Sequence, residues 1–558
     1  MSNDQQQPIQ LEKASFEFLE EDAQKLAALG YKQEFKREFN SLSLFCFAFS
    51  MMGVLASVSA SINFPMSHGG PVSMVWGWLT AASFVMPAQY IYIYIYIVAL
   101  MLAELCSSMP TTGGLYYFAA KLSMRSDKDL GWMPLVVWFT AWVNVVGNVA
   151  LVASIDWSLT QMVFAWITLV TDGAFVPTFE QTLGLYFAFL VLHGIIGSLP
   201  TKILAAINNF YVLLNLVATV VVIVCLYALP SKRNSASYVF THYDNAYSGW
   251  NDGFSYILGM LNAMWTLCGY GACCNIAEEC RDAARAGPRA IITSVISTVI
   301  AGWLILLAAT FAVTDLDAAL NSDFGMPMIQ IMYTSCGKPA TLGLWMLVIL
   351  VQLFTGSSAV IATSRVIFAF SRDGGLPFSR WWSIVNSYTQ TPINAVWLNV
   401  LGSALLGLLG FIDQAALDAI FNLASIGIYI AYGIPIFCRI TVGRHRFEPG
   451  PFHLGRWSTV IGSIACAWTC FIVVSFLFPY EKPVTSTNMN YAVVVLGAII
   501  TFAGVWFAVD ARKWFKGPRM TIDNDILNAV SVEASSTTQT EDCSFMFEAK
   551  DEKFITKA

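Results

Sequence analysis

Charge is what this chain has least of. Only 12% of its 558 residues are Asp, Glu, Lys or Arg, whereas soluble domains carry about 25%. In contrast, 56% of the residues are hydrophobic, and the mean hydropathy is +0.61. The net charge of −6 is spread over tails and loops, without the basic patch that nucleic-acid binding requires. We therefore expect one large domain in the lipid bilayer and no nucleic-acid partner.

Catalytic and cofactor motifs are also lacking. The chain contains no HExxH, no GxSxG and no phosphate-binding GxxxxGK[ST]. Its twelve cysteines and five histidines show no spacing that matches a metal-ligand set. Most of the cysteines lie in apolar runs, where a thiol acts as a small buried hydrophobe. We expect no enzyme, no cofactor, no metal site and no ATP-driven pump, so any pumping must use an ion gradient.

A cleavable signal peptide is not visible, because the first apolar run begins near Leu42, after some forty polar and charged residues. Residues 1–41 are expected to form a cytosolic segment, and residues 42–509 the membrane domain. The polar, Ser/Thr-rich residues 510–558 are expected to be a cytosolic tail that is largely disordered.

Long apolar segments are abundant. A bilayer core about 30 Å thick needs about 20 apolar residues in a helix, and the chain has twelve such segments. They lie near 42–63, 72–104, 133–155, 182–200, 205–229, 254–276, 290–313, 341–369, 393–411, 416–438, 457–478 and 490–509. The sequence therefore predicts an all-α integral membrane protein with twelve transmembrane helices.

The positions of Lys and Arg orient these spans. If both termini are cytosolic, only four of the 30 basic residues fall on the outer side: Lys232, Arg233, Lys338 and Lys482. Such an asymmetry is what the positive-inside rule expects of a correct topology. We therefore predict twelve spans with both termini in the cytosol.

The second span contains an unusual run, QYIYIYIYIV, at residues 89–98. Alternation is typical of a strand, but an isolated strand in lipid leaves its backbone groups unpaired. The span is also about a dozen residues longer than a bilayer requires. We interpret residues 87–97 as a repeat insertion or retained intron sequence, with a long tilted helix as the alternative. The transcript sequence decides between them.

Two spans contain small residues that favour a helix break. They are FSMMGVLASVSAS at 49–61 in the first span and WTLCGYGACCN at 265–275 in the sixth. Glycine has low helix propensity and leaves the backbone open to a ligand. Close packing of helices through small residues is the alternative. Because the two segments lie five spans apart, they favour the corresponding breaks of an inverted repeat, with a substrate site between them.

Ionisable residues inside spans are few, and such residues are often functional. Asp156 ends the third span and is a candidate for ion coupling. Glu104 lies at the inner end of the second span. His193, in the fourth span, is interpreted as a packed, hydrogen-bonded histidine rather than a proton relay.

A pair of carboxylates, Glu278 and Glu279, follows the predicted break in the sixth span. They either pair with Arg281 and Arg285 at the inner membrane face or take part in gating or coupling. The sequence leaves both readings open.

Several motifs together resemble the fungal amino acid/choline branch of the amino acid–polyamine–organocation superfamily, most closely its γ-aminobutyrate permeases. The resemblance extends from about residue 29 to 515. The motifs are LGYKQEFKREF (29–39), AELCSSMPTTGGLYYFAAKLS (103–123), SIDWSLT (154–160), EECRDAARAGPRAI (278–291), SRVIFAFSRDGGLPFSRWW (364–382), FEPGPFHLG (447–455) and STNMNYAVV (486–494).

This resemblance implies a LeuT-type fold, a 5+5 inverted repeat plus two helices, and proton-coupled uptake of amino acids or small amines. By position it implies that the first break offers backbone N–H groups to a substrate carboxylate. The implied substrate-binding residues are Ser50, Met51, Met52 and Gly53, the facing wall Cys268, Gly269, Tyr270 and Gly271, and Ser357 and Ser358 of the eighth span.

The chain departs from the family pattern at two positions. Relatives usually have an acidic residue at the position of Gly271, and often His at that of Asn275. The loss of the acid removes a partner for a substrate ammonium group.

Taken together, the sequence predicts a secondary transporter, a proton symporter, that imports a small amino acid or amine such as γ-aminobutyrate. Choline, polyamines and thiamine-type amines are the alternative substrates, and a transport-inactive nutrient sensor is the alternative class. The plasma membrane is favoured over the vacuole.

Overall fold

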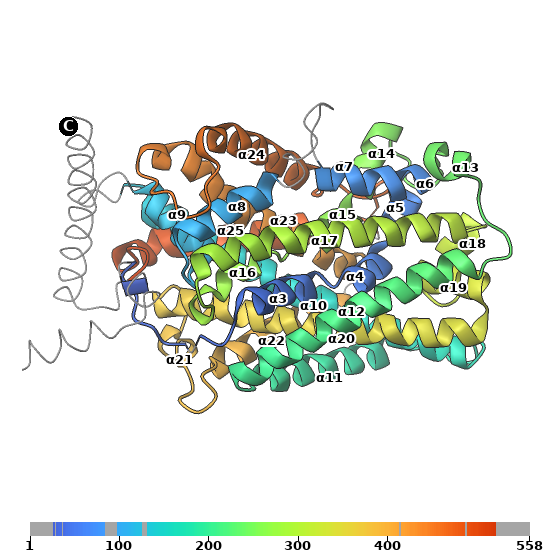
Figure 1. Ribbon diagram of the computed structural model, residues 1–558, viewed down its shortest axis with the longest axis horizontal. Coiled ribbons are helices and arrows are strands. Elements are labelled where there is room, and N and C mark those ends of the chain that lie inside the picture. The colour runs from blue at the N-terminus through green and yellow to red at the C-terminus, as the bar shows by residue number, and fades with distance from the viewer. Residues whose placement is uncertain are drawn as a thin grey trace, which may run out of the picture. The chain divides into compact units, whose positions relative to one another are not determined.

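The computed structural model describes residues 26–27, 29–35, 37–83, 97–124, 131–411, 414–485 and 488–519. Within them, Arg37–Gly517 form one compact unit. That unit is built from helices, with isolated bridges but no strand among the described residues. Its long helices run side by side (Figure 1). The expected all-α membrane architecture is therefore confirmed.

Ten helical segments are long and apolar enough to cross a membrane, and each coincides with one of the twelve predicted spans. They are α3–α5 (Ser41–Met52, Val54–Ser61, Asn63–Ser67), α10 (Met133–Val170), α11 (Phe179–Gly197), α12 (Thr201–Ala228), α17 (Ala283–Ala312), α20 (Lys338–Arg372), α22 (Ile393–Gly407) continued by η3 (Leu408–Phe411), α23 (Gln414–Ile440), α24 (Ser458–Ser475) and α25 (Ala492–Val509).

The other two predicted spans have no such uninterrupted helix among the described residues. In the second span, α6 (Gly70–Val72), η1 (Ser73–Gly77) and α7 (Trp78–Ser83) precede residues 84–96, and α8 (Ile97–Ser108) follows them. The Tyr-Ile run and its interpretation as an insertion therefore lie outside the described residues, apart from Ile97 and Val98 in α8.

The sixth span is divided into four short helices. They are α14 (Asp252–Gly259), α15 (Leu261–Thr266), α16 (Ala272–Asn275) and the 3₁₀ turn η2 (Ala277–Glu279). The remaining short helices lie in connections and are α9 (Gly114–Ser123), α13 (Ala236–Thr241), α18 (Leu316–Leu320), α19 (Pro327–Cys336), α21 (Ser379–Trp382), and the 3₁₀ turns η4 (Val442–His445), η5 (Gly455–Trp457) and η6 (Ala511–Lys513).

The predicted third span, 133–155, was too short, because α10 continues to Val170 over 38 residues. The polar residues that follow Ile155 lower the hydropathy, but the hydroxyls of Ser158 and Thr160 are hydrogen-bonded within the helix bundle. Thr160 Oγ1 donates to the carbonyl of Asp156 at 2.9 Å. The Ser158 hydroxyl donates to the Ile155 carbonyl and accepts from Gln352 Nε2 at 2.6 Å. The helix can therefore continue through a polar stretch without exposing unpaired groups to lipid.

Burial separates central from peripheral helices. The most apolar window of α10 is 72% buried, whereas that of α25 is 17% buried. The helices α3, α4, α10, α20 and α23 pack on one another at the centre. On α12, exposed apolar side chains form a stripe suited to lipid contact: Phe210, Leu213, Val217, Val220 and Val224. The polar groups of the predicted site lie on the central helices.

Candidate functional site

The first span breaks at the predicted glycine. Helix α3 ends at Met52, Gly53 has a left-handed backbone (φ +45°), and α4 begins at Val54. Two separate reasons require glycine at this position. The conformation is unfavourable for other residues, and a Cβ on Gly53 would lie 2.0 Å from Thr355 Oγ1 of α20. The broken helix and α20 are therefore in direct contact at this point.

The sixth span breaks on the facing side. Helix α15 ends at Thr266, a turn runs through residues 267–271, and α16 begins at Ala272. Gly269 in this turn has φ +97°, and a Cβ there would lie 3.3 Å from Met51 of α3. The two breaks thus lie next to each other, as an inverted repeat of five helices requires.

Two hydroxyl groups at the breaks are buried without a hydrogen-bond partner among the described residues. They are Ser50 Oγ, in the last turn of α3, and Thr266 Oγ1, at the end of α15. Gly53, as N-cap, gives no side-chain acceptor to the first turn of α4, whose N–H groups carry partial positive charge. Buried polar groups are normally paired, so this arrangement suits a small polar ligand with a carboxylate.

Two other predicted residues, Cys268 of the facing wall and Met52 of the first break, have polar groups that already form hydrogen bonds. The Cys268 thiol donates to the Trp265 carbonyl, and the Met52 carbonyl accepts from Ser57 Oγ at 2.8 Å. Both groups are thus already satisfied. Thr266 was not predicted, although it belongs to the quoted segment 265–275. Only the tertiary structure shows that its hydroxyl is free.

At Gly271, where the chain departs from the family pattern, Tyr432 fills the space beside the glycine. Its N–H donates to Tyr432 Oη of α23 at 3.1 Å, and a Cβ on it would lie 2.7 Å from the Tyr432 ring. The Tyr432 ring is 5.1 Å from that of Tyr270 and 5.9 Å from that of Tyr429, measured between centroids. A cluster of three tyrosines therefore fills the space that an acidic side chain at position 271 would need.

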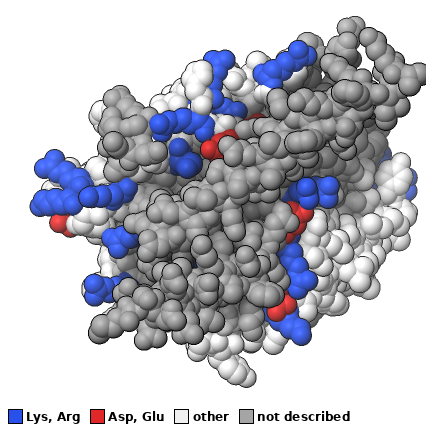
Figure 2. All heavy atoms as spheres, turned by 60° about the vertical axis from the view of Figure 1, so that its left-hand side comes forward, with Lys and Arg blue, Asp and Glu red and all other residues white. Residues whose placement is uncertain are grey.

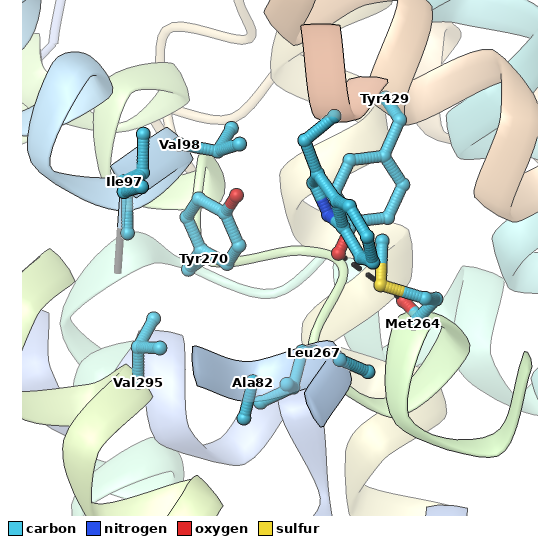
Figure 3. A pocket seen from close by; sticks show the side chains of 11 residues that line it. Ala82, Ile97, Val98, Met264, Leu267, Tyr270, Val295 and Tyr429 are labelled. Atoms are coloured by element: carbon cyan, nitrogen blue, oxygen red, sulfur yellow. Dashed lines mark hydrogen bonds between the residues drawn. The ribbon is translucent and has the colours of Figure 1, made fainter. Parts of the chain in front are cut away.

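The Tyr270 ring also lies against a small apolar pocket (Figure 3). The pocket has a volume of about 50 Å³, enough for a few water molecules. Helices α7, α8, α15, α17, α23 and α24 line it, with Val98, Val295 and Trp468 among the side chains. Tyr270, which belongs to the predicted facing wall, and Leu267 of the same turn both line this pocket, so the second break borders it directly.

On α20, the two predicted serines are fully buried and hydrogen-bonded. Ser358 Oγ donates to Asn208 Oδ1 of α12 at 2.8 Å, and Ser357 Oγ donates to the Leu353 carbonyl at 3.3 Å. Thr355, which was not predicted, is the residue of this segment that touches Gly53. The family resemblance pointed to this segment of α20 but not to the side chain that faces the break.

The carboxylates Glu278 and Glu279 do not pair with Arg281 and Arg285, so that structural reading was wrong. Glu278 accepts from the Thr112 N–H at 3.0 Å and from Arg372 at 3.3 Å. Glu279 forms a fully buried, two-bond ion pair with Arg365, with Nε–Oε1 at 2.8 Å.

The physical reason for these pairings is that α20 packs against α16, just before η2, which brings Arg365 and Arg372 to the carboxylates. Arg281 donates instead to the Arg37 carbonyl, and Arg285 lies 3.6 Å from Asp282 at the surface. The carboxylates thus join the loop at Thr112, η2 and α20 at one end of the domain.

This end of the domain also carries basic surface residues. Figure 2 shows Lys and Arg side chains gathered over the face that comes forward from the left-hand side of Figure 1, where α9, α16 and α21 lie. The exposed Lys121 and Arg380 belong to α9 and α21. Glu104 is buried near the same end, where it accepts from the Leu454 N–H at 3.0 Å and from Ser458 Oγ at 2.5 Å. We call this end of the domain, with α9, α16 and α21, the basic end.

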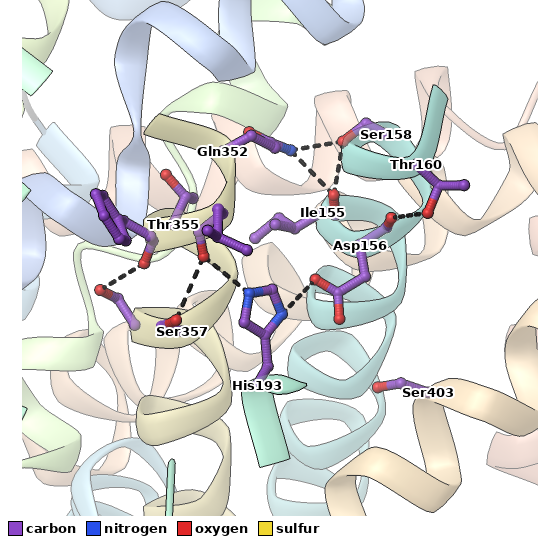
Figure 4. Close-up of polar contacts among 12 residues, drawn as sticks. Ile155, Asp156, Ser158, Thr160, His193, Gln352, Thr355, Ser357 and Ser403 are labelled. Atoms are coloured by element: carbon purple, nitrogen blue, oxygen red, sulfur yellow. Dashed lines mark hydrogen bonds and ion pairs between the residues drawn. The ribbon is translucent and has the colours of Figure 1, made fainter. Parts of the chain in front are cut away.

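Asp156 and His193 are brought together by the fold (Figure 4). Asp156 Oδ1 of α10 lies 2.8 Å from His193 Nδ1 of α11, and both side chains are fully buried. His193 Nε2 lies 2.8 Å from the Leu353 carbonyl of α20. Sequence analysis did not predict this contact, since 37 positions separate the two residues along the chain.

An all-helical membrane domain with two broken helices that face each other at its centre is the arrangement of a secondary transporter. The sequence model of the amino acid permease family matches residues 39–499. The chain therefore belongs to this family, whose members are transporters, and the resemblance to the amino acid–polyamine–organocation superfamily is confirmed.

Relatives of similar length support the assignment. An uncharacterized amino-acid permease of Schizosaccharomyces pombe is 40% identical and aligns over 91% of each chain. The amino-acid permease BAT1 of Arabidopsis thaliana is 35% identical, over 88% of this chain and 95% of its own. A GABA-specific permease of Saccharomyces cerevisiae is 34% identical, over 92% of this chain and 89% of its own.

Proposed function

We propose that this permease imports a small amino acid or amine, first of all γ-aminobutyrate, together with protons. The observation that carries the proposal is the meeting of the two helix breaks, with the unpaired hydroxyls of Ser50 and Thr266 beside them. The similarity to a GABA-specific permease over nearly the whole chain directs the choice of substrate.

In this proposal the substrate carboxylate binds at the first break. The N-terminal turn of α4 supplies N–H groups and the positive end of the helix dipole, and Ser50 Oγ donates a hydrogen bond. Ser50, Met51, Met52 and Gly53 form this side. Cys268, Gly269, Tyr270 and Gly271 form the facing wall, and Ser357 and Ser358 support the site from α20.

The ammonium group has no carboxylate at position 271, so it needs another partner. The C-terminal end of α15 offers the negative end of a helix dipole. The rings of Tyr270, Tyr429 and Tyr432 offer aromatic faces, which attract cations. These tyrosines also favour a second candidate, choline or a similar amine, because quaternary ammonium groups are bound by aromatic faces. Polyamines and thiamine-type amines come after it.

We further propose that the basic end faces the cytosol, as the positive-inside rule expects. Both termini would then be cytosolic, and the plasma membrane is the favoured location for an importer. The ion pairs of Glu278 and Glu279 would act as the cytosolic gate, since they join η2, next to the second break, to α20 and the Thr112 loop. Substrate release to the cytosol requires these contacts to open.

The test is uptake of radiolabelled γ-aminobutyrate at acid pH in cells that lack their own transporters and express this chain. A protonophore is added to one sample, and unlabelled choline to another. We expect uptake that collapses with the proton gradient and is not displaced by choline. Absence of uptake, from protein shown to reach the membrane, would refute the γ-aminobutyrate assignment. Uptake of labelled choline in the same cells would establish the second candidate, and binding without transport would indicate a nutrient sensor.

A further inference from the structure

The geometry assigns the buried pair Asp156–His193 as the site that carries the transported proton; this inference rests on the proton coupling of the proposed function. Asp156 lies on α10 and His193 on α11, and each contacts the turn of α20 that adjoins the first helix break (Figure 4).

The hydrogen bonds fix the number of protons on the pair. A backbone carbonyl only accepts, so the His193 nitrogen that lies 2.8 Å from the Leu353 carbonyl, Nε2, bears a hydrogen. The other ring nitrogen, Nδ1, lies 2.8 Å from Asp156 Oδ1. Without a hydrogen between them, two lone pairs would face each other at this distance. One proton therefore lies between Nδ1 and Oδ1, on the ring as imidazolium or on the acid as carboxyl, and in both forms the pair is neutral.

Loss of that proton leaves a net charge of −1 on a pair that is fully buried. The proton passes to water as hydronium, and no other bond changes. Neither oxygen of Asp156 has a further partner among the described residues. Among the described residues, Tyr186, whose hydroxyl donates to the Ser403 carbonyl, and Gly356 of α20 lie beside the pair, and both are uncharged. An unpaired buried charge is strongly unfavourable. The closed packing therefore requires the loaded, neutral pair, and the proton can leave only when the site opens to water.

The pair is connected to the substrate site through one turn of α20. A Cβ on Gly356 would lie 2.4 Å from His193 Cε1 and 2.8 Å from Asp156 Oδ1. The preceding residue, Thr355, contacts Gly53 at the first break. The Leu353 carbonyl accepts both from His193 and from Ser357. A change at the pair therefore acts on the same turn that packs against the broken helix, which is the physical link that coupling needs.

The decisive variant is Asp156→Asn. Its amide can donate to Nδ1 of a neutral His193, so it keeps the contact and the neutral charge but cannot release a proton. Purified full-length protein is reconstituted in liposomes with the membrane potential clamped and a gradient of one pH unit. One proton per substrate then sustains about tenfold accumulation of γ-aminobutyrate, since one pH unit is about 1.4 kcal/mol. We expect the variant to equilibrate γ-aminobutyrate without accumulation, while counterflow against internal unlabelled substrate continues.

Two further variants complete the experiment. His193→Gln removes the imidazole from the other side of the pair and should also lose proton-driven accumulation. Tyr186→Phe is the matched control, since it removes a buried hydroxyl beside the pair but no proton carrier, and it should accumulate substrate like the wild type. Counterflow shows that a variant is folded.

The outcomes separate this inference from the proposed function. Proton-driven accumulation by Asp156→Asn, or loss of counterflow in both pair variants, overturns the proton-carrier assignment while the transporter assignment stands. If the wild type itself moves no γ-aminobutyrate or choline, the proposed function fails. If wild-type accumulation ignores the pH gradient, both the proton coupling and the assignment of the pair fail.

Discussion

At the scale of single residues, the site is defined by which polar groups are free and which are already satisfied. Ser50 and Ser59 illustrate the difference. Both hydroxyls are buried in the first span, but Ser59 Oγ donates to the Leu55 carbonyl at 2.7 Å, whereas Ser50 Oγ has no partner among the described residues. A free buried hydroxyl next to a helix break is a group that substrate can satisfy.

Substitution Ser50→Ala should therefore weaken substrate binding. A hydrogen bond to a charged group contributes about 1.5–3 kcal/mol, so we expect the KM for γ-aminobutyrate to rise by about tenfold or more with the protein still at the membrane. Ser59→Ala is the matched control and should leave KM unchanged. Equal KM values for the two variants would contradict a role for Ser50 in binding.

Gly271 permits a second prediction, because the space beside it belongs to Tyr432. An aspartate introduced as Gly271→Asp would place its Cβ 2.7 Å from the Tyr432 ring. Overpacking of this kind costs about 1–3 kcal/mol, and the new carboxylate would be buried. We expect the single variant to lose thermal stability and uptake.

The double variant Gly271→Asp with Tyr432→Ala should recover part of the thermal stability and part of the uptake, because the Tyr432 ring no longer overlaps with the aspartate. Thermal unfolding in detergent and uptake in cells give the two measurements. Full activity of the single variant would show that Tyr432 moves freely and does not compensate for the missing acid.

At the scale of elements, the connection between α20 and η2 is the feature to test. Glu279 and Arg365 are 1% and 0% exposed in their side chains, so removing one partner leaves a buried charge. Such a change destabilises a protein by about 3–5 kcal/mol. We expect Glu279→Gln to lower the unfolding temperature clearly, and Glu279→Gln combined with Arg365→Met to restore most of it.

The exposed pair Lys338–Asp172 serves as the comparison. It has the shorter contact, 2.6 Å, but its side chains are 32% and 78% exposed. Surface pairs contribute about 0–1 kcal/mol, so Asp172→Asn should change the unfolding temperature little. A loss as large as that of Glu279→Gln would argue against burial as the cause.

At the scale of the whole molecule, the orientation in the membrane is the main prediction. An epitope inserted after Val484, an exposed position in the connection before α25, should be accessible to antibody on intact cells. One inserted after Tyr388, which is 90% exposed between α21 and α22, should be accessible only after permeabilisation. The reverse pattern would place the basic end outside and would contradict the proposed cytosolic gate.

Local features of the sequence determined the architecture of this protein. Apolar runs and the distribution of Lys and Arg predict spans because the bilayer acts on each segment separately. Ten of the twelve predicted spans coincide with long helices. The breaks at Gly53 and in 267–271 were predictable for the same reason, since backbone freedom at glycine is a local property. The length of α10 was not predictable, because its polar side chains are paired within α10 itself and with α11 and α20.

The tertiary structure decided how the site residues pair. Glu278 and Glu279 bind Arg372 and Arg365, which are 94 and 86 positions away in the chain. Asp156 meets His193 in the space that Gly356 leaves open, as Thr355 lies in the space at Gly53 and Tyr432 in that at Gly271. Hydropathy and spacing carry no information about such contacts, because they depend on how helices rotate and cross when they pack. The sequence thus determined a permease with two broken helices, and the packing of α20 against them decided which polar groups are hydrogen-bonded and which are left unpaired among the described residues.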